Sequence, residues 1–267
     1  MKDLAIFIDS FDGNADAWPT FFKVYQKFWN DCPYPRYLVT NNLDYQADGL
    51  TVIKTGEEKN WFVMTIKGLE QVKEKYIYFV LEDQLIGQKM NNDDIEEIVA
   101  GMEKENIFFY RMTCPANYPA GQSFIQVTED ARYPISLQPA IWEKETFLRF
   151  LKDFYANGCK SPWDFERHFI EKYKNGDPGK YIDGIRYDSR NLMNYKNILI
   201  QGKWDPRVVK FYKENGIIVE TGSRPFMPRK AVFLDGIKRN KWIRSLSNRD
   251  QSMIKKLLKK LGIDFMT

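Results

Sequence analysis

The sequence predicts an α/β fold in which a mostly parallel central sheet is flanked by helices. In the first half of the chain, short apolar strands alternate with helical patterns, which is typical of such sheets. The chain has 267 residues, 43% of them hydrophobic and 15% aromatic, enough for one large globular domain or for one domain with a small appendage. Ligands bind such sheets at the carboxyl ends of the strands.

Five apolar runs in the first half predict strands, and three helical patterns are interspersed among them. The strands are expected at residues 4–8, 36–40, 50–55, 76–81 and 107–112. Aromatic residues at helical spacing between Trp18 and Trp29 indicate the first helix, and the second begins at Trp61. The third lies within residues 91–106, where an asparagine cap precedes acids in the first turn.

The second half is expected to contain fewer regular elements. Residues 113–132 are rich in Pro, Gly, Asn and Gln, and predict loops with a short hairpin around residues 123–128. Further strands are expected at 133–142, 196–204 and 217–222. Helices are expected over Phe147 to Phe154, from Ser161 with Pro162 in the first turn, and over 205–216.

Composition excludes several classes of protein. The three cysteines, Cys32, Cys114 and Cys159, are far apart and odd in number, so neither a disulfide framework nor a clustered zinc site is expected, and His168 is the only histidine. No segment approaches the roughly 18 consecutive apolar residues of a membrane-spanning helix. The N-terminus lacks the apolar region of a signal peptide, so a cytoplasmic protein is expected.

Basic charge is concentrated in the tail. Residues 229–267 carry a net charge of +8, which leaves −4 for residues 1–228 out of the total of +4. We therefore expect a main domain over 1–228 and a basic helical extension over 229–267. A helix near 248–262 places lysines opposite an apolar face, which suits either an anionic membrane surface on the inner face of the cytoplasmic membrane or a packed helix with a solvated lysine face. Nucleic acid is not expected as a partner, because no aromatic and basic recognition motif is present.

Two adjacent acids, Glu82 and Asp83, close the apolar run at 76–81. Carboxylates at the end of a central strand lie where parallel sheets bind ligands, and a hard divalent cation prefers oxygen ligands. Such a cation would neutralise a diphosphate leaving group. The competing interpretation is that solvated acids simply end the strand.

The order of several segments resembles a group of bacterial glycosyltransferase-like proteins encoded with capsule and O-antigen biosynthesis. The segments are "IFIDSFDG", "WPTFFKVYQKFW", "CPYPRYLVTNN", "NWFVMTIKGLEQVKEKYIYFVLEDQLIG" and "ISLQPAIWEKETFLRFL" with "SPWDFE". The resemblance runs from about Leu4 to Trp204 and implies the GT-A fold, a single nucleotide-sugar-binding α/β domain. In that family the acid-ended strand usually finishes in two aspartates and an aromatic residue, where this chain has Glu82, Asp83 and Gln84.

The resemblance implies a donor site for a nucleotide sugar in about residues 1–112. Asp9 and Ser10, after the first strand, and Asn41, after the second, are expected near the base and ribose. Asp83 with Glu82 is expected to hold Mg²⁺ or Mn²⁺ on the diphosphate. Lys67 is a candidate for contact with a phosphate, although lysines on helices are usually solvated.

The resemblance places the acceptor in about residues 113–228. Asp164 or Glu166 is expected to take the proton of the acceptor hydroxyl, with Asp164 slightly preferred, unless both acids only complement the helix dipole. Trp163 is expected to offer an apolar platform to a sugar ring. Gln138 and Trp142 are candidates for sugar contact, or equally for sheet-edge and core positions.

The expected function is therefore transfer of a sugar from a nucleotide sugar to a saccharide or lipid-linked acceptor. A nucleotidyltransferase of related fold is one alternative, although "IDSFDGNADAW" supplies no glycine-rich phosphate loop with a basic residue. A non-catalytic carbohydrate-binding protein is another. Arg224, in a basic loop, is a further candidate for the diphosphate, and Asn14 is expected to serve only a turn or helix cap.

Overall fold

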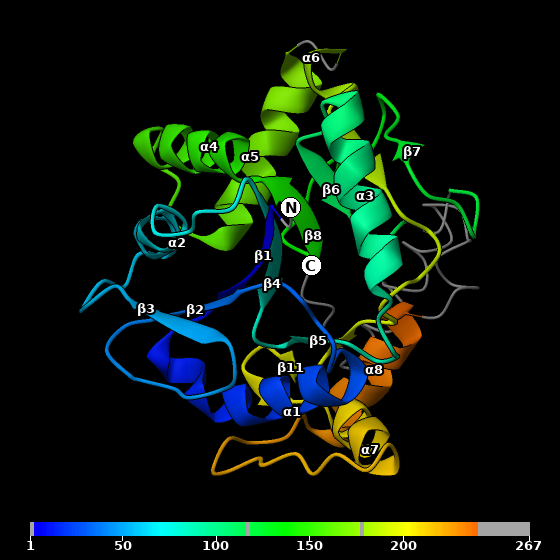
Figure 1. Ribbon diagram of the computed structural model, residues 1–267. Helices are drawn as coiled ribbons and strands as arrows, with labels where there is room; N and C mark the ends of the chain where they lie inside the picture. The colour runs from blue at the N-terminus through cyan, green and yellow to red at the C-terminus, as the bar shows by residue number, and fades with distance from the viewer. Residues whose placement is uncertain (1–2, 116–117, 177–178, 240–267) are drawn as a thin grey trace, which may run out of the picture.

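A computed structural model describes residues 3–115, 118–176 and 179–239 of the chain (Figure 1). Within this part, an eight-stranded sheet has the order β3-β2-β1-β4-β8-β6-β9-β7. Its strands are β1 (Leu4–Asp9), β2 (Arg36–Thr40), β3 (Leu50–Lys54), β4 (Tyr76–Leu81), β6 (Phe109–Arg111), β7 (Ile125–Gln126), β8 (Ala140–Glu143) and β9 (Ile185–Tyr187). Strands β3, β2, β1 and β4 pair in parallel, as do β6 and β9, whereas β8 and β7 pair antiparallel to their neighbours. The predicted α/β class, with a large, mostly parallel sheet flanked by helices, is confirmed.

Helices lie on both faces of this sheet. They are η1 (Asp12–Ala17), α1 (Trp18–Phe28), α2 (Trp61–Leu69), α3 (Asn92–Glu105), α4 (Lys144–Ala156), α5 (Pro162–Asn175), α6 (Gly179–Ile182), α7 (Pro206–Glu214) and α8 (Arg229–Arg239). Figure 1 shows α2, α4 and α5 gathered on one side of the central strands, with α1 and α3 on the other. The six helices predicted within residues 1–228 are confirmed as α1 to α5 and α7.

Strand β1 explains why the helices form two layers. Its residues are all buried, and successive side chains of a strand point to opposite faces. Leu4, Ile6 and Ile8 join the core beneath α1, α3 and α7, and Ala5 and Phe7 join the core beneath α2, α4 and α5. The site described below therefore stands on a sheet that is packed on both sides.

Three predicted strands of the second half were wrong in extent. Of the segment 133–142, only its end belongs to a strand, β8, and the residues before Ala140 follow an irregular path. The segment 196–204 contains β10 (Lys196–Asn197) and then a hairpin of β11 (Leu199–Ile200) and β12 (Lys203–Trp204). The segment 217–222 forms no strand. Residues 125–126 pair with β9 rather than within a local hairpin.

The chain after residue 195 returns to the acid-ended strand. Strand β10 pairs with β5 (Gln84–Leu85), and the amide of Ile198 donates to the carbonyl of Asp83 at 2.9 Å. Helix α8 is tied to α7 by an ion pair between Arg207 and Asp235. The rest of the predicted basic extension, including the helix near 248–262, lies outside the described residues. No helix in the described part has the length and apolar character needed to cross a membrane.

Candidate functional site

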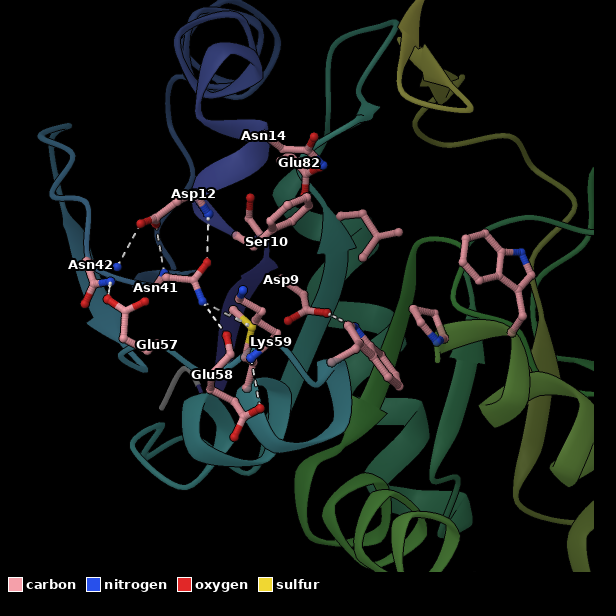
Figure 2. Close-up of a pocket in the computed structure, with 16 residues that line it drawn as sticks. Asp9, Ser10, Asp12, Asn14, Asn41, Asn42, Glu57, Glu58, Lys59 and Glu82 are labelled. Carbon is pink, nitrogen blue, oxygen red and sulfur yellow. Dashed lines mark hydrogen bonds between the residues drawn. The ribbon is translucent and has the colours of Figure 1, made fainter. Parts of the chain in front are cut away.

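A cavity of about 690 Å³ opens at the carboxyl ends of β1, β2 and β4, the edge at which parallel sheets bind ligands (Figure 2). Five of the predicted site residues line it: Asp9, Ser10, Asn41, Glu82 and Trp163. The other lining residues are Phe11, Asp12, Asn14, Asn42, Glu57, Glu58, Lys59, Trp61, Met64, Leu81 and Pro162. The wall thus combines the loops after β1 and β2, the end of β4, and the first turns of α2 and α5.

Asp9 ends β1 at the floor of the cavity. Its side chain is 3% exposed, and one carboxylate oxygen accepts a hydrogen bond from the Trp61 indole nitrogen at 2.5 Å. The Thr65 hydroxyl lies 3.2 Å from the other oxygen. Burial raises the pKa of Asp9 from 3.8 to about 7, and the two hydrogen bonds oppose that rise. The Asp9 carboxyl group is therefore held in place by two hydrogen bonds and has a pKa near 7.

The loops after β1 and β2 are tied together by Asp12. Its carboxylate accepts hydrogen bonds from the backbone amides of Asn41 at 2.9 Å and Asn42 at 3.0 Å. The Asn41 side chain in turn accepts from the Asp12 amide and donates to the carbonyls of Gly56 and Glu58. These reciprocal bonds make one wall of the cavity rigid, with backbone and side-chain polar atoms along it (Figure 2).

Glu82 and Asn14 lie side by side at another end of the cavity (Figure 2). Glu82 is 5% exposed and accepts a hydrogen bond from the Asn14 amide. Burial, and next the neighbouring Asp83 charge, raise the pKa of Glu82 to about 8. The expectation that Asn14 serves only a turn or cap was wrong, because its side chain reaches 68 residues along the chain to Glu82. Local sequence carries no signal for such a contact.

Asp83 lies beside Glu82 but is not among the lining residues of the cavity. Burial raises its pKa to about 6, and the positive charge of Arg224 opposes that rise. One carboxylate oxygen, Oδ1, is buried without a hydrogen-bond partner. A buried unpaired carboxylate oxygen is costly, so a ligand that supplies positive charge would relieve it.

Glu82 and Asp83 offer adjacent carboxylates to a divalent cation. The free Oδ1 of Asp83 and the Glu82 carboxylate are hard oxygen ligands of the kind that Mg²⁺ and Mn²⁺ prefer. Within the described residues, no cluster of three or more His, Cys, Asp or Glu side chains has the geometry of a metal site. The remaining ligands would therefore come from phosphate oxygens and water, as is usual for Mg²⁺.

The cavity wall is strongly acidic. Among the described residues that line it, Asp9, Asp12, Glu57, Glu58 and Glu82 carry carboxyl groups, and Lys59 is the only lysine or arginine. Lys67 is absent from the wall: its side chain is exposed, and the ammonium lies 3.4 Å from the carbonyl of Thr55. A diphosphate in this cavity would be surrounded mainly by carboxyl groups rather than by basic side chains, so a bound cation would have a clear electrostatic role.

The two predicted catalytic acids lie in the first turns of α5 but have different environments. Asp164 forms a capping box with Ser161 and also pairs with Arg167, and its hydrogen bonds, first that from Lys160, lower its pKa well below the usual range. Such a carboxylate is a poor base. Glu166 accepts from the Leu137 amide at 2.8 Å, and burial raises its pKa. Of the two acids, Glu166 has the environment of a general base.

The same helix brings Trp163 to the mouth of the cavity. Its side chain is 72% exposed, which is unusual for tryptophan. Neither Asp164 nor Glu166 lines the cavity, although Pro162 and Trp163 do. The first turn of α5 therefore presents an apolar surface to the opening.

The remaining acceptor candidates have different environments. Gln138 accepts hydrogen bonds from Arg111 and, at 3.0 Å, from the Thr113 hydroxyl. Trp142 is fully buried and stacks on Phe147 with ring centroids 4.4 Å apart. Trp142 is thus a core residue, which corrects its expected role in sugar contact. Gln138 belongs to a polar cluster at the same edge of the sheet, and it does not line the cavity.

Phe11 is a site residue that sequence reasoning missed. It lies in the loop between β1 and η1, is 47% exposed and lines the cavity. A Cβ atom at Gly13 would lie 2.3 Å from the Phe11 ring, so the glycine leaves room for the ring in this position. An aromatic residue two positions before a glycine, just after the first strand, is the signal that was available in "SFDG".

No family model and no curated protein matches this sequence. Among solved structures, S. aureus TarS is 14% identical with a TM-score of 0.43, covering 69% of this chain, and this chain spans 34% of that one. Residues 1–349 of TarS in complex with UDP-GlcNAc give 15% identity and a TM-score of 0.46, covering 93% and 77% of the two chains. The 2-C-methyl-D-erythritol 4-phosphate cytidylyltransferase from Thermus thermophilus gives 7% identity and a TM-score of 0.45, covering 74% and 93%. Likenesses of this size carry no information about function.

Proposed function

We propose that the protein is a GT-A-like glycosyltransferase that transfers a sugar from a nucleotide sugar to a saccharide or lipid-linked acceptor. The observation that carries the proposal is the cavity of about 690 Å³ at the carboxyl ends of β1, β2 and β4, with Asp9 and Glu82 in its wall. A volume of this size suits a nucleotide-sized ligand. The sequence resemblance adds bacterial capsule or O-antigen biosynthesis as the expected setting.

The nucleoside would lie against the loops after β1 and β2. Phe11 offers an exposed aromatic face, and aromatic side chains stack on bases of any identity. Asp9, Ser10 and Asn41 supply polar atoms along the same wall. The Ser10 hydroxyl already accepts from the Trp18 indole at 2.8 Å, which fixes its position.

The diphosphate would lie toward the end of β4. Glu82, and Asp83 with its unpaired Oδ1, would hold a divalent cation there. The bound cation would supply neutralisation of the diphosphate as it leaves. Support comes from the many carboxyl groups of the wall, where Lys59 is the only lysine or arginine in the part of the chain that the structure describes.

The acceptor would approach from the side of α5. In the transfer, the bond between the anomeric carbon and the diphosphate oxygen breaks, the acceptor oxygen bonds to that carbon, and the hydroxyl proton goes to a base. Glu166 is the better candidate for that base, because burial raises its pKa whereas capping contacts lower that of Asp164. Trp163 would stack on a sugar ring at the mouth, and Gln138 would contact the acceptor from the next polar cluster.

The proposal also includes the acceptor and the place in the cell where transfer would occur. A lipid-linked acceptor would bring the protein to the inner face of the cytoplasmic membrane, where the basic residues of 229–267 would meet anionic headgroups. The proposed partners are thus the donor, the acceptor and this surface.

A product assay separates this function from the two alternatives. A glycosyltransferase releases a nucleoside diphosphate from a nucleotide sugar, whereas a nucleotidyltransferase releases pyrophosphate from a nucleoside triphosphate and a sugar phosphate. We expect release of nucleoside diphosphate in Mn²⁺ or Mg²⁺ from at least one donor in a panel of nucleotide sugars. Pyrophosphate release would support the nucleotidyltransferase, and sugar binding without either product would support the carbohydrate-binding protein.

A further inference from the structure

The guanidinium of Arg224 joins two segments that lie more than 200 residues apart in sequence. Its Nε and Nη2 donate to the two carboxylate oxygens of Asp16, each at 2.7 Å, and Nη2 also donates to Asn14 Oδ1 at 2.9 Å. Further bonds run to the carbonyls of Gly13 at 2.9 Å and Gly202 at 3.1 Å. The side chain is 13% exposed. Arg224 therefore fastens the η1 loop to the hairpin between β11 and β12.

The loop that carries Arg224 is held in place by Trp204. Trp204 is fully buried, and its indole donates to the carbonyl of Thr221 at 2.8 Å. The backbone of Trp204 also exchanges hydrogen bonds with Pro225 and Met227, which follow Arg224 in the chain. These contacts hold the loop from which the guanidinium reaches the cavity wall.

The hydrogen bond from Arg224 to Asn14 determines which way the side-chain amide of Asn14 faces. A guanidinium only donates hydrogen bonds, so the carbonyl oxygen of the Asn14 side chain faces Arg224, and the amide nitrogen faces Glu82. The amide donates to Oε1 of Glu82 and so fixes this carboxylate at the cavity wall. The orientation of a carboxylate in the cavity thus depends on a residue from the far end of the described chain.

We propose that Arg224 is a positioning residue, which latches the η1 loop to residues 198–228 and holds Asn14 so that it orients Glu82 for the donor diphosphate. The role in orienting Glu82 for a donor rests on the proposed function. The latch itself is a property of the ligand-free protein. This assignment differs from direct phosphate binding by Arg224, because Nε and Nη2 are engaged by Asp16, Gly13 and Asn14, and Arg224 does not line the cavity.

Substitution of Asp16 distinguishes a positioning role of Arg224 from direct binding of the diphosphate by Arg224. If Arg224 bound the diphosphate directly, removing Asp16 would free the guanidinium and strengthen binding. If Arg224 acts as a latch, Asp16→Ala weakens binding as Arg224→Ala does, although Asp16 does not line the cavity. Arg224→Lys keeps the charge without the forked geometry, so a latch predicts loss there too.

The ligand-free test observes the side-chain amide of Asn14 by NMR. We expect the Asn14 amide signals to move toward solvent-exposed values in Arg224→Ala and Asp16→Ala. Arg190→Ala is the matched control, because Arg190 also pairs with an aspartate, Asp188, and its other ion pairs run to Asp94 and Glu97 rather than to the η1 segment. Unchanged Asn14 signals in both latch variants would overturn the latch.

The binding test measures the affinity of UDP, GDP and ADP by calorimetry in Mn²⁺. We expect about tenfold weaker binding in Arg224→Ala, Asp16→Ala and Asn14→Ser, with no further loss in the pairwise combinations and none in Arg190→Ala. Unchanged affinity in the three variants, or tighter binding in Asp16→Ala, would overturn the positioning role. Failure of the wild type to bind any of the three nucleotides would contradict the proposed function, while the NMR result would still decide the latch.

Discussion

The indole of Trp61 donates a hydrogen bond of 2.5 Å to the carboxylate of Asp9 and so ties the start of α2 to the end of β1. Asp9 is the most buried acid in the cavity wall, and Trp61 is part of the same wall. One contact thus fixes a carboxyl group of the candidate donor site and the helix that flanks it.

Replacing Trp61 by Phe tests this contact, because the variant keeps an aromatic ring and lacks the N–H donor. The indole hydrogen bond favours the ionised form of Asp9, so the variant should have an Asp9 pKa above about 7. We expect a loss of roughly 1–3 kcal/mol in the free energy of unfolding at pH 8, and a smaller loss at pH 5.5, where Asp9 is protonated. Urea unfolding at the two pH values measures this. An equal loss at both values would contradict the assignment.

The raised pKa of Glu82 predicts that the free energy of unfolding of the metal-free protein depends on pH. The pKa of Glu82 is about 8 in the folded state against 4.5 as the ordinary value, so the folded protein binds a proton that the unfolded chain releases. The associated stability is complete below pH 4.5 and is lost as the pH rises to about 8. Glu82→Gln removes this titration and keeps the acceptor for Asn14.

We therefore expect Glu82→Gln to gain stability over the wild type between pH 5 and 8, on the order of 1–3 kcal/mol. Chemical denaturation in a chelator across this range measures the difference. Parallel pH profiles for the two proteins would show that Glu82 does not titrate in this window.

Substitutions of the two acids of α5 should have different effects, on stability for Asp164 and on turnover for Glu166. Asp164→Ala removes the capping box, so we expect a lower midpoint of urea unfolding with turnover nearly unchanged. Glu166→Gln should lower turnover by about 10²–10⁴ with donor affinity unchanged, as loss of a general base does. Steady-state kinetics with calorimetric donor binding distinguishes them. Loss of turnover in Asp164→Ala alone would reverse the assignment.

Gly13 and Phe11 should act as a pair in nucleotide binding. Gly13→Ala would place a methyl group 2.3 Å from the present position of the Phe11 ring, which is exposed and would move. We expect about tenfold weaker binding of nucleoside diphosphates in Gly13→Ala and in Phe11→Ala, through lost stacking. The double variant should be no weaker than Phe11→Ala. Additive losses would mean that Gly13 contributes by another route.

The first half of the fold was predictable because its signals are local. Strand and helix periodicity located β1 to β4 and α1 to α3, and the carboxyl-end rule located the edge at which Asp9, Asn41 and Glu82 meet. These residues come from strands whose ends a parallel sheet brings together.

The rest depends on contacts that periodicity does not encode. The bond from Asn14 to Glu82 spans 68 residues, and that from Arg224 to Asp16 spans 208. Strand β8 is short because only residues from Ala140 onward pair with β4 and β6, although the apolar run begins earlier. The burial of Trp142 follows from that pairing and from α4 packing over it, so its sequence neighbours did not indicate it.

The most direct test of the account is thermal stabilisation of the protein by a panel of nucleotide sugars, with and without Mn²⁺. We predict stabilisation by at least one donor in Mn²⁺, loss of that shift in Asp83→Asn, and its retention in Asp153→Asn, a surface carboxylate paired with Lys172 away from the cavity wall. Absence of stabilisation by every donor, or an undiminished shift in Asp83→Asn, would contradict the account.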